Sequence, residues 1–271
     1  MKYDISLLAA DTYRVTDPGL ADTPANLFVL FGSEKVLLID SGYGWGDLHE
    51  VLRQIIRSRK NRSDRTKQVF CALTHGHDDH IQGAAQFDRF YISRADAALY
   101  AENADLTAIR DADPDTYARC VTPQMAAFYE VSHRDKHPLF LDEIPVFELG
   151  GRAVEVEHFP GHTAGSVVFF DRNTRLVFEG DIAPKSAWFF YRALPLTQYG
   201  QNLCAYREWL KTRGCAGRYE GHQQTAQPVS GIDENIACLQ QLQALRKAAD
   251  KPASRFEELQ VQGKRIIFRN W

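Results

Sequence analysis

The 271-residue chain lacks the features of secreted, membrane-spanning and nucleic-acid-binding proteins. No apolar run is long enough to span a bilayer, and the first residues hold only a short apolar stretch that contains an acid, unlike a secretory signal. The 32 basic and 35 acidic residues give a net charge of −3 without a long basic run, which argues against nucleic acid or a membrane as partner. We therefore expect a cytoplasmic protein.

Paired cysteine motifs are also missing. The five cysteines are odd in number and include no Cys-x-x-Cys pair. This pattern favours reduced, mostly buried thiols over a disulfide framework. At this length, one α/β domain with a large core, spanning residues 1–271, is the expectation.

What the chain does contain is the heptapeptide Thr74 to His80, Thr-His-Gly-His-Asp-Asp-His, directly after an apolar run. His75 and His77 are two residues apart on extended backbone, so they point to the same side and can share one metal ion. Asp79 and His80 fall at the start of a predicted helix and can reach a second ion. One motif therefore offers two half-sites.

Three further candidate ligands follow predicted strands. His162 lies in a glycine-rich loop after the predicted strand 153–156, Asp181 ends an apolar strand, and His222 ends another. The full candidate set is His75, His77, Asp79, His80, His162, Asp181 and His222. Five imidazoles and two carboxylates without a thiolate suit zinc or iron and do not suit a structural Cys-type site.

A lone His-x-His segment is more often a solvated loop than a metal site. The ligand candidates at three other strand ends favour metal binding instead. The expected division gives His75, His77 and His162 to one ion, and Asp79, His80 and His222 to the other. Asp181 is expected to bridge them.

These motifs resemble, in order and kind, those of the metallo-β-lactamase superfamily of metal-dependent hydrolases, and the resemblance spans residues 26–222. The matching segments are Leu38 to Gly42, His75 to His80, His162, Asp181 and His222. The resemblance implies an α/β fold of the αββα sandwich type, in which two mixed sheets pack between helices.

The metals imply a mechanism. A bridging hydroxide is expected to attack an ester, lactone, thioester or related bond of a small molecule. Asp79 is expected to orient that hydroxide and collect its proton. Asp40 is expected to orient a ligating histidine, or else only to cap the end of its strand. Two divalent ions are expected, first of all Zn2+, with Fe or Mn as alternatives.

The single aspartate at position 181 resembles the glyoxalase II and lactonase-like branches. The aromatic cluster Trp188, Phe189, Phe190 and Tyr191 is a candidate substrate pocket, or an ordinary buried segment. Two other functions stay open: a mononuclear-iron oxygenase of the persulfide dioxygenase type, and a metal-bound sensor without turnover.

A helical insertion is expected at about 93–141, with helices over 95–101 and 114–131. It is a lid, a contact in a homodimer, or packing only. Apolar residues at helical spacing predict further helices over 46–59, 81–87 and 232–249. A hairpin is predicted from strands 26–30 and 35–39.

Overall fold

The structure is a computed structural model that describes residues 3–20, 23–44, 46–59, 62–104, 118, 123, 136–184, 187–190, 195–247, 256–261 and 264–269. The chain divides into two compact units, Met1–Val156 and Glu157–Trp271. The expected single domain stays a prediction.

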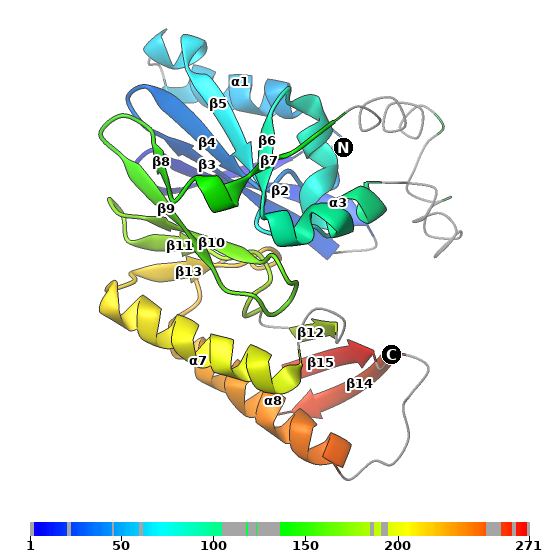
Figure 1. Ribbon diagram of the computed structural model, residues 1–271. Helices are drawn as coiled ribbons and strands as arrows, with labels where there is room; N and C mark the ends of the chain where they lie inside the picture. The colour runs from blue at the N-terminus through cyan, green and yellow to red at the C-terminus, as the bar shows by residue number, and fades with distance from the viewer. Residues whose placement is uncertain are drawn as a thin grey trace. The chain divides into compact units, whose positions relative to one another are not determined.

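The first unit is built on a seven-stranded mixed sheet whose strands lie in chain order (Figure 1). The strands are β1 (Asp4–Ala9), β2 (Thr12–Leu20), β3 (Thr23–Phe31), β4 (Lys35–Ile39), β5 (Gln68–Ala72), β6 (Phe90–Ile92) and β7 (Leu139–Phe140). β1 to β4 pair antiparallel, as the predicted hairpin requires, and β4 to β7 pair parallel. Because parallel strands end at the same edge, the segments that follow β4, β5 and β6 meet there.

The core of the first unit joins the sheet to α1 (Leu48–Arg59). Leu48, Val51, Leu52 and Ile55 are buried at the spacing that predicted this helix. The predicted helix 81–87 is different: α2 (Asp78–Ile81) begins inside the heptapeptide and continues as the 3-10 turn η2 (Gln82–Gln86). A side chain at Gly83 would lie 2.3 Å from the Ser41 carbonyl oxygen, so this turn packs backbone against backbone.

The predicted insertion begins with η3 (Arg94–Asp96) and α3 (Ala97–Asn103), which confirms a helix near 95–101. The predicted helix 114–131 lies outside the described residues except for two isolated positions. The unit closes with η4 (Leu141–Glu143) and the antiparallel pair β8 (Val146–Glu148) and β9 (Ala153–His158). The last two residues of β9 belong to the second unit.

The second unit contains another mixed sheet and two long helices. β11 (Leu176–Phe178) pairs antiparallel with β10 (Val167–Asp171) and parallel with β13 (Gly217–Tyr219). α7 (Leu196–Thr212) and α8 (Gly231–Lys247), yellow and orange in Figure 1, run side by side and share a core with β10 and β11. An α/β fold with two mixed sheets is therefore confirmed, and α8 matches the helix predicted over 232–249.

A smaller sheet of the second unit was not predicted. β12 (Ala187–Phe190) pairs parallel with β15 (Lys264–Arg269), which pairs antiparallel with β14 (Phe256–Val261). Among the described residues, no helix has both the length and the apolar character needed to cross a membrane.

Candidate functional site

Four candidate ligands lie together in the first unit, on the loop after β5 and on α2. The ring of His75 is 4.8 Å from that of His77 and 4.2 Å from that of His80, measured between centroids. His80 Nε2 lies 3.7 Å from Asp79 Oδ1. His75 and His80 are buried, whereas His77 and Asp79 are partly exposed. The heptapeptide therefore gathers its imidazoles and one carboxylate as predicted.

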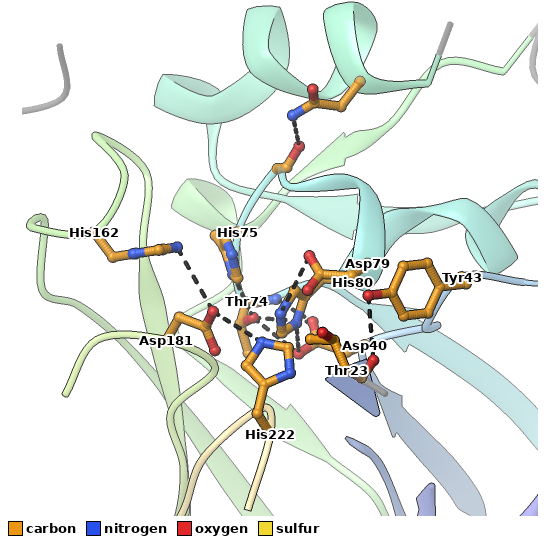
Figure 2. Close-up of polar contacts among 12 residues, drawn as sticks. Thr23, Asp40, Tyr43, Thr74, His75, Asp79, His80, His162, Asp181 and His222 are labelled. Carbon is orange, nitrogen blue, oxygen red and sulfur yellow. Dashed lines mark hydrogen bonds and ion pairs between the residues drawn. The ribbon is translucent and has the colours of Figure 1, made fainter. Parts of the chain in front are cut away.

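Asp40, at the end of β4, organises two of these imidazoles (Figure 2). Its Oδ2 lies 2.8 Å from His80 Nδ1, and Thr74 Oγ1 donates to the same carboxylate at 2.9 Å. Thr74 Oγ1 is also 3.0 Å from His75 Nδ1. Since a hydroxyl has one proton and gives it to the carboxylate, His75 must donate from Nδ1 to the hydroxyl. Both imidazoles are therefore held through Nδ1, with Nε2 as the atom that can bind a metal.

The backbone around Asp40 supports this arrangement. Asp40 has φ +59°, a left-handed conformation that aspartate tolerates better than most residues. Ser41 donates both its N–H and its hydroxyl to the His80 carbonyl, each at 2.8 Å. The Gln82 N–H binds the Gly42 carbonyl at 3.1 Å. The turn after β4 therefore fixes the backbone of α2 as well as the ring of His80.

The second unit contributes its own cluster of three candidate ligands (Figure 2). Asp181 Oδ2 lies 3.1 Å from His222 Nε2 and 3.7 Å from His162 Nε2. Ligand atoms at about 2.0–2.2 Å from one tetrahedral metal ion stand about 3.3 Å apart. Both distances from Asp181 are close to this value, so Asp181 can share an ion with either histidine.

Helix α7 holds the backbone beside two of these ligands. Tyr199 donates its hydroxyl to the Ile182 carbonyl at 2.6 Å, and Ile182 directly follows Asp181 in the sequence. Asn202 Nδ2 donates to the Pro160 carbonyl at 2.7 Å, two residues before His162. The two side chains are three positions apart and thus lie on one face of the helix.

A buried ion pair connects β11 to β13. Glu179 pairs with Arg218 and accepts the Tyr206 hydroxyl, and Arg218 also donates to the Pro228 carbonyl at 3.1 Å. Burial raises the pKa of Glu179, although the Arg218 charge and these hydrogen bonds favour ionisation. Glu179 is two residues before Asp181, so this network fixes the strand end that carries the aspartate.

The electrostatics of the heptapeptide favour cation binding. Burial, and the charge of Asp79 beside it, raise the pKa of Asp78 to about 6. Acidic groups that repel one another in this way are stabilised by a positive ion nearby. The donor set and its electrostatics therefore both suit a divalent cation.

The structure presents all seven predicted ligands as potential metal-binding side chains, four in the first unit and three in the second. The aromatic cluster is different, because Tyr191 and the side chains of Trp188, Phe189 and Phe190 lie outside the described residues. The sequence analysis missed Thr74, although it lies inside the motif. It also missed Tyr199 and Asn202, whose helical spacing is typical of ordinary core packing.

A comparison with protein families adds a direct match. The protein-family model described as "Metallo-beta-lactamase superfamily" matches residues 20–218, which contain every candidate ligand except His222.

Two curated relatives are similar over part of the chain. An acyl-coenzyme A thioesterase of Homo sapiens, MBLAC2, is 30% identical over 58% of this chain and 58% of its own length. A hydroxyacylglutathione hydrolase of Haemophilus influenzae, GloC, is 28% identical over 41% of this chain and 47% of its own length. The chain thus spans less than two thirds of the length of these relatives.

A solved structure shows the fold. The metallo-beta-lactamase from Pontibacter korlensis superposes with a TM-score of 0.64 at 18% identity, covering 88% of this chain and 99% of that one. At this identity the likeness concerns the fold alone, and it confirms the predicted fold class.

Proposed function

Because the chain belongs to the metallo-beta-lactamase superfamily, we propose that it is a hydrolase that uses two divalent metal ions to cleave an acyl thioester of a small molecule, such as an acyl-coenzyme A. The observation that carries this proposal is the orientation of His75 and His80, whose Nδ1 atoms are both held through Asp40. Imidazoles fixed in this way by a carboxylate are typical of metal ligands.

The proposed ligand assignment keeps the division expected from the sequence. We assign one ion to His75, His77 and His162, and the other to Asp79, His80 and His222. Asp181 would supply a carboxylate to both. The nitrogen and oxygen donors suit Zn2+ first, and Fe or Mn next.

Ions bound there would supply a water whose pKa is lowered toward about 7, and would polarise the acyl carbonyl. Residues of the chain would accept the proton and orient the ligands. Asp79, whose side chain is 17% exposed, would accept a proton from the attacking water. Asp40 and Thr74 keep the Nε2 atoms of two ligands aimed and unprotonated.

The thioester is favoured over the other bonds by the relatives. Both named relatives are hydrolases of acyl compounds, and the human one is a thioesterase of acyl-coenzyme A. The fold itself does not choose among esters, lactones, β-lactams and thioesters, because one fold hosts many chemistries.

The test is a substrate panel on the purified protein and two variants. We expect acyl-coenzyme A thioesters to be cleaved faster than lactones or β-lactams. Asp79→Asn and His80→Ala should each lose at least about 100-fold in turnover while circular dichroism shows a folded chain. His137→Ala, at an exposed histidine outside both clusters, is the matched control. Thioester hydrolysis that survives both variants would refute the proposal.

Metal analysis in the same experiment separates the main alternative. Two ions per chain with hydrolysis support the proposal. One iron per chain with oxygen consumption would instead support a mononuclear oxygenase.

A further inference from the structure

Gly76 stands between His75 and His77 and shares one peptide plane with each, and side chains at the two ends of α3 bind its N–H and its carbonyl. The Gly76 N–H donates to Asp96 Oδ2 at 3.0 Å. Asn103 Nδ2 donates to the Gly76 carbonyl at 2.8 Å. Asp96 immediately precedes α3 and Asn103 is its last residue. One short helix thus satisfies both polar groups of this glycine.

A third hydrogen bond attaches the end of the motif to the same helix. Gln82 Nε2 donates to the Asn103 carbonyl at 2.6 Å. Gln82 is only two residues past His80, so α3 contacts the heptapeptide segment near its start and just beyond its end. The partners are 20 to 27 positions apart in the sequence. Such contacts come from tertiary structure and do not form within the loop alone.

Helix α3 also lies directly against Gly76. A Cβ added at Gly76 would lie 3.1 Å from the Tyr100 nitrogen and 3.2 Å from the Leu99 Cβ. The loop therefore has little space in which to rotate its peptide groups. Its glycine is explained by close packing, because its φ is not positive.

We propose that Asp96 and Asn103 are positioning residues for His75 and His77, and that they set the affinity of the metal ion these two histidines hold. This inference rests on the proposed function. The orientation of a peptide plane fixes a torsion angle on each side of it. The Gly76 N–H lies in the plane shared with His75, and the Gly76 carbonyl lies in the plane shared with His77. Holding both groups therefore constrains the direction of the imidazoles at positions 75 and 77. The first helix of the predicted insertion thus has a role in the metal site.

The proposal predicts an asymmetry between the two ions. His80 is oriented separately, by Asp40 at its ring and by Ser41 at its carbonyl. Loss of the α3 contacts should thus weaken the ion assigned to His75 and His77 more than the ion assigned to His80. Loss of a residue that orients a ligand typically costs about 10- to 100-fold in metal affinity.

Two pairs of variants test the hydrogen bonds, and only Asp96→Ala changes the size of the side chain appreciably. Asn103→Asp replaces the donor by an oxygen that faces the Gly76 carbonyl. Asp96→Asn keeps an oxygen that can accept the Gly76 N–H, whereas Asp96→Ala does not. Asn173→Asp makes the same exchange at an exposed turn of the second unit and serves as control.

The measurement is stepwise Zn2+ affinity by competition with a chromophoric chelator, with the number of ions per chain from elemental analysis. His77→Ala and His222→Ala identify which binding step belongs to which ion. We expect Asn103→Asp and Asp96→Ala to weaken the step that His77→Ala removes by about 10- to 100-fold. Asp96→Asn and Asn173→Asp should stay within about 3-fold of the wild type, because each keeps the contacts in question.

Three results would overturn the inference. Unchanged affinity in both Asn103→Asp and Asp96→Ala would refute it while leaving the proposed function intact. Equal weakening of both steps would show that α3 supports the fold in general. A wild-type chain that binds no ion would refute the proposed function together with the inference. If Asn103→Asp does not fold, rescue of Asp96→Ala by Asp96→Asn decides the question.

Discussion

Asp40 Oδ2 lies 2.8 Å from His80 Nδ1, and the same carboxylate accepts the hydroxyl that holds His75. One side chain therefore orients two imidazoles. The first prediction follows: Asp40→Gly should lower turnover about 10- to 100-fold, because both ligands lose their support. Glycine accepts the positive φ of this position, so the variant removes the carboxylate without adding backbone strain. Steady-state kinetics provides the measurement.

Asp40→Asn is the companion variant, since asparagine also tolerates a positive φ. It keeps one acceptor oxygen but has no charge, and we expect a smaller loss. Wild-type turnover in Asp40→Gly would contradict the role given to Asp40.

Tyr199→Phe should reduce the amount by which bound metal stabilises the fold. The change removes only the hydroxyl that binds the Ile182 carbonyl and leaves that carbonyl buried, at a cost of about 1–2 kcal/mol. Because Ile182 follows Asp181, we expect metal to raise the melting temperature less in the variant than in the wild type. Melting curves with and without chelator check this. An equal metal-dependent rise in both proteins would exclude a role for this hydrogen bond in the site.

Gly161 and Gly200 form a matched pair for alanine substitution. A Cβ at Gly161 would lie 2.2 Å from a Tyr199 ring atom. A Cβ at Gly200 would have no described atom within 4 Å apart from its chain neighbours and the nearby backbone of its own helix. Gly161→Ala should destabilise the chain by about 1–3 kcal/mol and displace His162. Gly200→Ala, in the interior of α7, should stabilise it by about 0.5–1 kcal/mol. Urea unfolding and metal content measure both effects. A Gly161→Ala chain with wild-type stability and metal content would contradict the packing described.

Asp64 makes acid stability testable away from the metal ligands. Burial opposes ionisation of this carboxyl, but the ion pairs with Lys67 and Arg59 outweigh it and lower its pKa. A lowered folded-state pKa stabilises the fold above the ordinary value of about 3.9, and this contribution disappears as the pH falls through the folded-state pKa. At pH 7, Asp64→Asn should thus be less stable by about 2 kcal/mol. The difference in unfolding free energy between the variant and the wild type should disappear below about pH 4, as urea unfolding at a series of pH values would show. A difference that does not change with pH would refute this assignment.

The sequence predicted those parts of the fold that local patterns encode. The heptapeptide, the hairpin of β3 and β4, and the helices α1 and α8 follow from apolar spacing and motif chemistry. The pairing of β12 with β15 could not be predicted, because it joins residues more than 70 positions apart. Pattern analysis also gave a regular helix after His80, where close packing of Gly83 produces a 3-10 turn.

The candidate site shows the same division. Its ligands are visible in the sequence because histidine and aspartate cluster at strand ends. Asp40 was expected from the sequence to orient a histidine. The other supporting residues, Thr74, Asp96, Asn103 and Tyr199, are common residue types in ordinary positions. Only tertiary contacts reveal their roles, such as the hydrogen bond between Asn103 and Gly76.

The central claim is that the two clusters of histidine and aspartate hold divalent ions that make the chain a thioesterase. The most direct measurement is acyl-coenzyme A hydrolysis by the same preparation before chelation, after chelation, and during stepwise return of Zn2+. We expect chelation to abolish hydrolysis and activity to return fully at two ions per chain. Hydrolysis that persists in the metal-free chain, or that is absent from the fully loaded chain, would contradict the central claim.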